Sequence, residues 1–141
     1  MPSDESSIEQ LFLKGSDFDA RKAIKEILAK ARHKATIIDR YVLCDKGETV
    51  SQELIDLLPL DKQVEITIIT KKEPSQQKTQ SHNISFVISK DFHDRFIIVD
   101  DTDVWHLGAS IKDAGKKACM LNQIMDSEIA STILSVINEL H

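Results

Sequence analysis

Apolar residues recur at helical spacing in some segments of the chain and form short β-branched runs in others. The 3.6-residue period predicts three helices, at about residues 17–33, 47–58 and 127–140. The β-branched and alternating runs predict strands at 35–42, 64–70, 84–88, 95–99, 104–107 and 118–124. A short lysine-bearing helix is expected at 111–117, and the polar segment 71–83 is expected to be a surface loop or a frayed helix.

The helical pattern also predicts which side chains face the core. In the first helix these are Phe18, Ala23, Ile24, Ile27, Leu28 and Ala31. In the last helix they are Ile129, Ile133, Val136, Ile137 and Leu140. Ser16 or Asp17 is a candidate N-cap for the first helix, and Thr49 or Ser51 for the second.

The order of these elements predicts an α/β fold. Helices and strands alternate early in the chain, which favours parallel strands, whereas the consecutive middle strands favour antiparallel pairing. We therefore expect one mixed β-sheet flanked by helices. Residues 17–141 should form this single domain, and residues 1–16 should be an N-terminal tail. The sequence contains no internal repeat and no long linker.

Composition and charge narrow the function classes. Of 141 residues, 41% are hydrophobic and 29% are charged, which fits a globular domain. The 18 Lys and Arg against 23 Asp and Glu give a net charge of −5, which argues against a protein that coats nucleic acid. The start of the chain has no secretory signal pattern and no apolar run could span a bilayer, so a cytoplasmic location is expected.

The segment His93-Asp-Arg95 followed by Asp100 is the strongest chemical candidate. His93 and Arg95 are two residues apart, so in an extended chain their side chains share a face. An imidazole can attack phosphorus or transfer a proton, and a guanidinium holds two phosphate oxygens. Asp100 lies about 20 Å of extended chain from His93. The pair suits phosphate chemistry, and the alternative is an ordinary charged surface strand.

Other polar residues give less specific signals. Asp39, Arg40 and Tyr41 end a predicted strand, where they would either line a pocket or simply close the strand. His106 is expected to be a hydrogen-bonded core histidine, and the alternative is a second catalytic histidine. His33, His82 and His141 have no zinc-ligand spacing, and neither do Cys44 and Cys119. No nucleotide-binding glycine motif is present.

The pattern His93-x-Arg95-(x)4-Asp100, followed by Gly108-Ala-Ser110, resembles the HxK(x)4D…GS signature of the phospholipase D superfamily. The whole run of residues 92–117 is similar to bacterial phospholipase D-like domains. It is also similar to the C-terminal domains of MIT-domain proteins, which have a His-Asp-Arg core. The resemblance implies a phospholipase D-like mixed sheet with one motif per chain.

This resemblance also implies a metal-free, cofactor-free phosphodiesterase that uses two histidines. His93 would be the nucleophile in one copy and the general acid in the other, so that the site is completed in a homodimer. Arg95 stands at the position of the phosphate-binding lysine, and Asp100 at that of the motif aspartate. Ser110 and Lys112 are the candidate substrate-binding residues.

Three departures from the signature keep a second function open. Arg95 replaces the usual lysine, one residue is inserted into the Gly-Ser pair, and only one motif is present. We therefore expect either a phosphodiesterase, such as a nuclease, or a catalytically reduced module. Such a module would bind phosphate groups of a membrane lipid, a nucleic acid or a partner protein.

Overall fold

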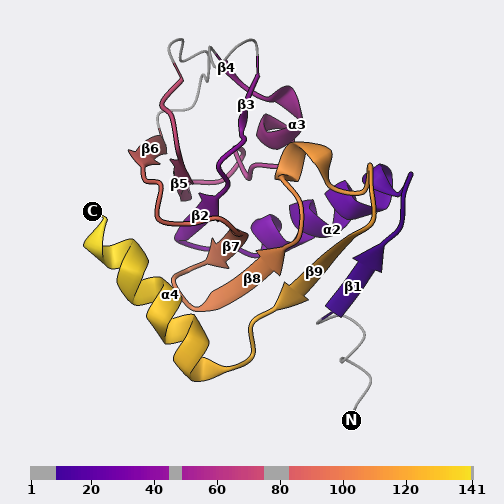
Figure 1. The fold of residues 1–141 in the computed structure, drawn as a ribbon. Helices are drawn as coiled ribbons and strands as arrows, with labels where there is room; N and C mark the ends of the chain where they lie inside the picture. Colours follow the sequence, from indigo (N-terminus) through magenta and orange to yellow (C-terminus); the bar gives the residue numbers. More distant parts are fainter. Residues whose placement is uncertain (1–8, 45–48, 75–82, 141) are drawn as a thin grey trace.

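The chain folds around a seven-stranded mixed sheet. The structure, a computed structural model, describes residues 9–44, 49–74 and 83–140. The strand order across the sheet is β1-β9-β8-β7-β2-β5-β6 (Figure 1). These strands are β1 (Glu9–Phe12), β2 (Lys34–Ile38), β5 (Glu65–Thr70), β6 (Ile84–Ile88), β7 (Arg95–Val99), β8 (Asp103–Leu107) and β9 (Cys119–Gln123). The expected mixed-sheet α/β fold is confirmed.

The remaining elements are short or flank the sheet. The helices are α2 (Asp17–Ala29), α3 (Gln52–Ile55), α4 (Ser127–Glu139) and a 3₁₀ turn, η3 (Ile111–Asp113). A separate two-stranded sheet pairs β3 (Leu43–Cys44) with β4 (Thr49–Val50) in antiparallel orientation. Within the described part of the chain, no helix is long and apolar enough to cross a membrane.

The strand directions bring several chain segments to one edge of the sheet. Strands β2, β5 and β6 are parallel, so their carboxyl ends lie on the same side. Strand β7 runs antiparallel to β2, with Ile38 opposite Phe96, so β7 begins where β2 ends. Residues that follow β2 and residues that precede β7 therefore meet at this edge.

Alternating side chains fill a core on each face of the sheet. On one face, Ile37, Ile97 and Leu107 pack in a cluster that includes Ile24 and Leu28 of α2. The other face carries a smaller cluster, formed by Ile38, Ile69, Ile98 and Val104 with Ile137 of α4. Because Arg95 alternates with Ile97 along β7, its side chain belongs to the first face.

Two apolar residues of the predicted helix faces are exposed instead. Phe18 is 77% exposed because it lies nine residues, and so about 180° around the helix, from the buried Ile27. Ile129 is 51% exposed, about 80° from the buried Ile137 of α4. Both expectations are wrong because each side chain lies near a helix end and outside the buried stripe of its helix.

Three segments differ in extent from the prediction. Of the helix expected at 47–58, the structure has only α3, which begins after the cap Ser51; residues 45–48 lie outside the described part. Of the helix expected at 111–117, only η3 forms. The expected tail contains β1, which pairs with β9 from Glu9 to Phe12. Residues 1–8, and 75–82 of the expected loop, lie outside the described residues.

Candidate phosphate site

Two pairs of polar residues lie where β2 ends and β7 begins. Asp39 and Arg40 directly follow β2, and His93 precedes Arg95, the first residue of β7. The register of the two antiparallel strands places Asp39 alongside Arg95, one position beyond the pair Ile38–Phe96. To His93 and Arg95, which the sequence predicts, the structure adds Arg40, whose guanidinium contacts His93, and Asp39, which lies near Arg95.

Asp39 is completely buried beneath this edge and accepts several hydrogen bonds. Its carboxylate accepts from the backbone N–H of Tyr41 (2.9 Å) and of Ile111 (2.7 Å). The Ser110 hydroxyl donates to the same carboxylate, with distances of 3.1 and 3.0 Å to its two oxygens. Asp39 therefore ties the end of β2 to the start of η3.

Burial raises the pKa of the Asp39 carboxyl above its usual value. The hydrogen bonds from Ile111, Tyr41 and Ser110 favour the charged form, as does the nearby positive charge of Arg95, but desolvation outweighs them. Arg95 itself is half-buried, and its Nε has no hydrogen-bond partner among the described residues. Its guanidinium is the cation next to this buried acid.

His93 is exposed at the same edge and contacts an arginine. Its Nδ1 lies 2.9 Å from Nη1 of Arg40. Arg40 is half-buried, and its Nε is also without a hydrogen-bond partner in the described chain. One imidazole and two guanidinium groups at the edge of a sheet form a set of donors suited to a phosphate group.

Ser110 and Lys112 were expected to bind substrate. Ser110 is only 4% exposed, and its hydroxyl lies within hydrogen-bonding distance of Asp39 and, at 3.3 Å, of the Tyr41 carbonyl. Because a hydroxyl has one proton to donate, this arrangement commits it to holding Asp39. Lys112 is a half-buried residue of η3, and its role stays a prediction.

Asp100 lies at the other end of β7 from His93. Its carboxylate accepts from the backbone N–H groups of Arg32 (3.1 Å), His33 (2.8 Å) and Lys34 (3.0 Å). Desolvation raises the pKa of this carboxyl, but the three N–H donors and the nearby His33 outweigh it, so the pKa is lowered. Asp100 has a structural role here, and the structure does not bring it to the site.

His106 is held by two polar partners. Its Nε2 lies 3.2 Å from the Asp94 carboxylate and its Nδ1 lies 3.3 Å from the Asn122 side-chain oxygen. The ring also packs against Phe96, with 5.5 Å between centroids. His106 is thus a hydrogen-bonded, half-buried histidine rather than a second free one.

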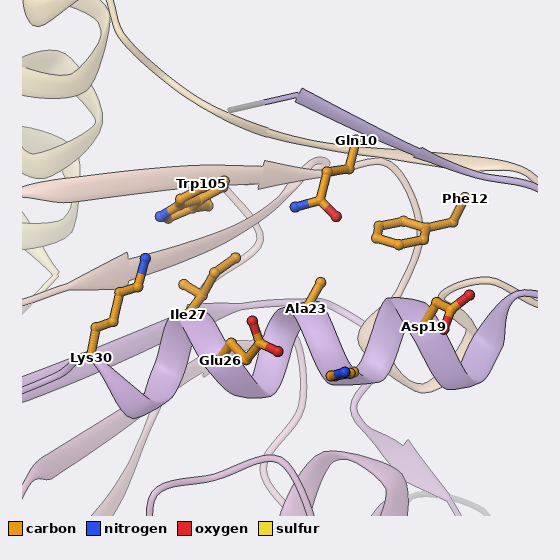
Figure 2. A pocket seen from close by; sticks show the side chains of 9 residues that line it. Gln10, Phe12, Asp19, Ala23, Glu26, Ile27, Lys30 and Trp105 are labelled. Atoms are coloured by element: carbon orange, nitrogen blue, oxygen red, sulfur yellow. The ribbon is translucent and has the colours of Figure 1, made fainter. Parts of the chain in front are cut away.

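A groove elsewhere in the molecule does not include these residues. It has a volume of about 290 Å³ and lies between α2 and the strands β1 and β8 (Figure 2). Its lining consists of Gln10, Phe12, Asp19, Lys22, Ala23, Glu26, Ile27, Lys30 and Trp105. Over residues 9–44, 49–74 and 83–140, no group of three or more His, Cys, Asp or Glu side chains could hold a metal ion.

Among the comparisons with known proteins, only the comparison with solved structures supports the fold. No protein-family model matches the sequence, and no curated protein matches it. Among solved structures, NucT from Helicobacter pylori has a TM-score of 0.65 at 15% identity and covers 94% of both chains. Nuc from Salmonella typhimurium, described as a phospholipase D family member, has the same TM-score and identity, over 94% of this chain and 92% of that one.

A larger protein contains a similar unit. The polyphosphate kinase from Porphyromonas gingivalis matches with a TM-score of 0.64 and 14% identity, over 92% of this chain but only 22% of that chain. In NucT and Nuc, by contrast, the likeness extends over nearly the whole length of both partners. The resemblance that the His93 motif indicates is therefore confirmed at the level of the fold: this chain has the phospholipase D-like fold.

Proposed function

We propose that this chain is a phosphodiesterase whose site contains His93 and Arg95 and is completed by a second copy of the chain. The observation that carries this proposal is the contact of the exposed His93 with the Arg40 guanidinium, two residues before Arg95 at the start of β7 on this fold. Arg95 and Arg40 would hold the non-bridging oxygens of a phosphodiester and stabilise the charge that develops on them.

Two histidines divide the chemistry in this proposal. Nε2 of one His93 attacks phosphorus, so that an N–P bond forms and the ester P–O bond breaks. The departing oxygen keeps the bonding electron pair and takes a proton from His93 of the second copy. Water then attacks the phosphohistidine and gives a proton to His93 of the second copy. The N–P bond breaks, which releases the phosphate monoester and restores both histidines.

The need for a second copy follows from the histidines of one chain. His106 is held by Asp94 and Asn122, and the backbone of His33 lies at the opposite end of β2, bonded to Asp100. Within the described residues, His93 is therefore the exposed histidine at this edge. A two-fold dimer would place two such residues in one site. The net charge of −5 favours a small or locally held diester over a long nucleic acid.

The test is turnover of bis(p-nitrophenyl) phosphate in the presence of a chelator. Wild type should cleave it, and His93→Ala should reduce kcat at least about a hundredfold because the nucleophile is lost. His33→Ala is the matched control, since it removes an exposed histidine from the other end of β2, and it should retain activity. Equal rates for wild type and His93→Ala would overturn the proposal.

A second candidate function is phosphate binding without cleavage. The contact between His93 Nδ1 and Arg40 favours it, because an arginine can only donate and so occupies a nitrogen lone pair of the ring. Calorimetry with dimethyl phosphate separates the two functions. Binding that is lost in Arg95→Ala, without any turnover of the nitrophenyl diester, would support the binding module against the enzyme.

A further inference from the structure

Arg40 is held in a defined position next to His93. It follows the buried Asp39, whose carboxylate also accepts the N–H of Tyr41 at 2.9 Å and so fixes the turn after β2. The Nε of Arg40 is buried, whereas its Nη1 reaches the exposed imidazole at 2.9 Å. The side chain is therefore partly enclosed, with one donor directed at Nδ1 of His93.

This contact decides which nitrogen of the neutral ring carries the proton. A guanidinium group has donors only, so the nitrogen facing it must offer a lone pair. With Nδ1 as the acceptor, the proton of a neutral imidazole resides on Nε2. A doubly protonated ring has no lone pair on Nδ1, so it cannot accept the arginine donor in this contact.

Each catalytic role of a histidine conflicts with that arrangement. A nucleophile that attacks through Nε2 needs a lone pair there, and a general acid needs a proton on both nitrogens. The neutral ring with Nε2–H can instead donate a hydrogen bond to a phosphate oxygen. While Arg40 contacts Nδ1, His93 is therefore arranged to bind a phosphate and not to attack it.

We propose that Arg40 is a positioning residue that sets the tautomer of His93 and keeps the ring a hydrogen-bond donor until Arg40 leaves Nδ1. This inference rests on the proposed function only in taking His93 as the reactive group. A bound phosphodiester would supply the displacement, since its oxygens compete for the same Arg40 donors. Attack by His93 would then follow the transfer of Arg40 from the ring to the phosphate.

The experiment measures the tautomer directly on the full chain labelled with ¹⁵N. Two-bond ¹H–¹⁵N correlation spectra distinguish a protonated ring nitrogen from a bare one. They are recorded at a pH about two units above the ordinary imidazole pKa of about 6.5. In wild type we expect the proton of His93 on Nε2, in excess by about tenfold or more, as one hydrogen bond from a charged donor would give. A proton on Nδ1 would overturn the inference.

Two variants at position 40 show whether the arginine is the cause. Arg40→Lys keeps a donor and should leave the proton on Nε2. Arg40→Glu supplies a carboxylate, which only accepts, so the Nδ1–H form should become the major one. Arg21→Glu is the charge-matched control on the surface of α2, where Arg21 pairs with Asp17, and it should leave the tautomer unchanged. An identical tautomer in Arg40→Glu and wild type, or the same reversal in Arg21→Glu, would overturn the inference.

The tautomer is measured without substrate, so the two proposals fail separately. If wild type shows Nε2–H, the Glu variant reverses it and no diester is cleaved, the proposed phosphodiesterase is wrong and the role of Arg40 stands. If the diester is cleaved but wild-type His93 carries its proton on Nδ1, the role of Arg40 is wrong and the phosphodiesterase stands. Where the Glu variant does not fold, Arg40→Ala takes its place: the excess of the Nε2–H form should fall there, and an excess unchanged from wild type would overturn the inference.

Discussion

Asp39 and Asp100 both accept several hydrogen bonds from backbone N–H groups, yet their pKa values shift in opposite directions. Asp39 is fully buried, and desolvation dominates over its hydrogen bonds. Asp100 loses less contact with water, so its three N–H donors dominate. Two carboxylates with similar hydrogen-bond donors therefore have opposite effects on how the free energy of unfolding depends on pH.

Asp39→Asn should change the pH dependence of stability. Because the folded-state pKa of Asp39 is raised, the folded protein binds this proton more tightly than the unfolded chain does. The contribution of Asp39 to the unfolding free energy is thus largest below pH 3.8, the usual value, and falls as the pH rises through the folded pKa. Asparagine does not titrate. The difference in unfolding free energy between wild type and variant, measured by urea unfolding, should therefore decrease as the pH rises from 3.8 through the folded-state pKa of Asp39.

Ser110→Ala checks the assignment of this effect. The Ser110 hydroxyl favours the charged form of Asp39, so its removal should raise the pKa of Asp39 further. The pH range over which the contribution of Asp39 to stability is lost should then extend to higher pH. A pH profile for Asp39→Asn that runs parallel to wild type would contradict the role given to burial.

Asp100→Ala should destabilise the fold by about 2–4 kcal/mol. It removes hydrogen bonds to a charged acceptor and places alanine at a φ of 54°. Asp100→Asn should cost less, because asparagine tolerates this φ and still accepts one N–H group. Since the pKa of Asp100 is lowered, its stabilisation is present above pH 3.8 and is lost as the pH falls through the folded pKa.

The measurement for Asp100 is urea unfolding combined with binding of dimethyl phosphate. A structural role predicts lower stability with unchanged affinity in the folded protein. Loss of affinity or turnover in Asp100→Ala, without loss of stability, would instead support the catalytic role that the motif predicts.

The sequence predicts the site residues that are close along the chain and misses those that come together only in the fold. His93 and Arg95 follow from the two-residue period of a strand. The role of Asp39 depends on Ser110 and Ile111, which lie 71 and 72 residues away and reach it through η3. The signal that could have identified Asp39 is an acidic residue directly after a buried β-branched run.

At the scale of elements, the beginning of α2 packs against the segment after η3. The backbone N–H of Ser16, the N-cap of α2, donates to the carbonyl of Gly115 at 2.9 Å. Gly115 has a φ of +81°, and a Cβ atom built there would lie 2.5 Å from Cα of Asp17. Only glycine allows the two backbones to approach this closely. The contact helps to set where η3, and with it Ser110, lies relative to the first helix.

Gly115→Ala should therefore be more destabilising than Gly15→Ala. Gly15 also has a positive φ, +86°, but a Cβ there would meet nothing within 4 Å. We expect about 1–2 kcal/mol for the backbone strain at Gly15, and about 1–3 kcal/mol more at Gly115, where the side chain meets backbone atoms. Thermal or urea unfolding of both variants measures the difference, and equal losses would show that the packing against Asp17 contributes nothing.

The central strands could be predicted and the elements at the margins could not. Segments such as Glu65–Thr70 and Arg95–Val99 are β-branched and buried, which gives them a clear pattern. The edge strand Glu9–Phe12 contains no β-branched residue and is defined by its pairing with β9. The helix expected at 47–58 is limited by Ser51, which accepts the N–H of Leu54 and starts α3 there.

At the scale of the whole molecule, the element order was enough for the fold class, because helix–strand alternation and consecutive strands require a mixed sheet. Two of the similar solved structures, NucT and Nuc, share the fold over nearly the whole chain at 15% identity. Assembly could not be predicted in the same way: the resemblance to a two-motif signature predicts a site shared between two copies, but a sequence contains no measure of the affinity between copies.

Activity per chain should therefore fall on dilution. If two His93 residues share a site, a chain is active only as a dimer, so its specific activity follows the dimer fraction and decreases below the dissociation constant. Diester turnover measured over a dilution series, with sedimentation at the same concentrations, checks this. Excess His93→Ala chains added to a fixed amount of wild type should also lower its activity, because mixed dimers contain one histidine. If the specific activity stays constant on dilution while the protein sediments as a monomer, one chain holds a complete site.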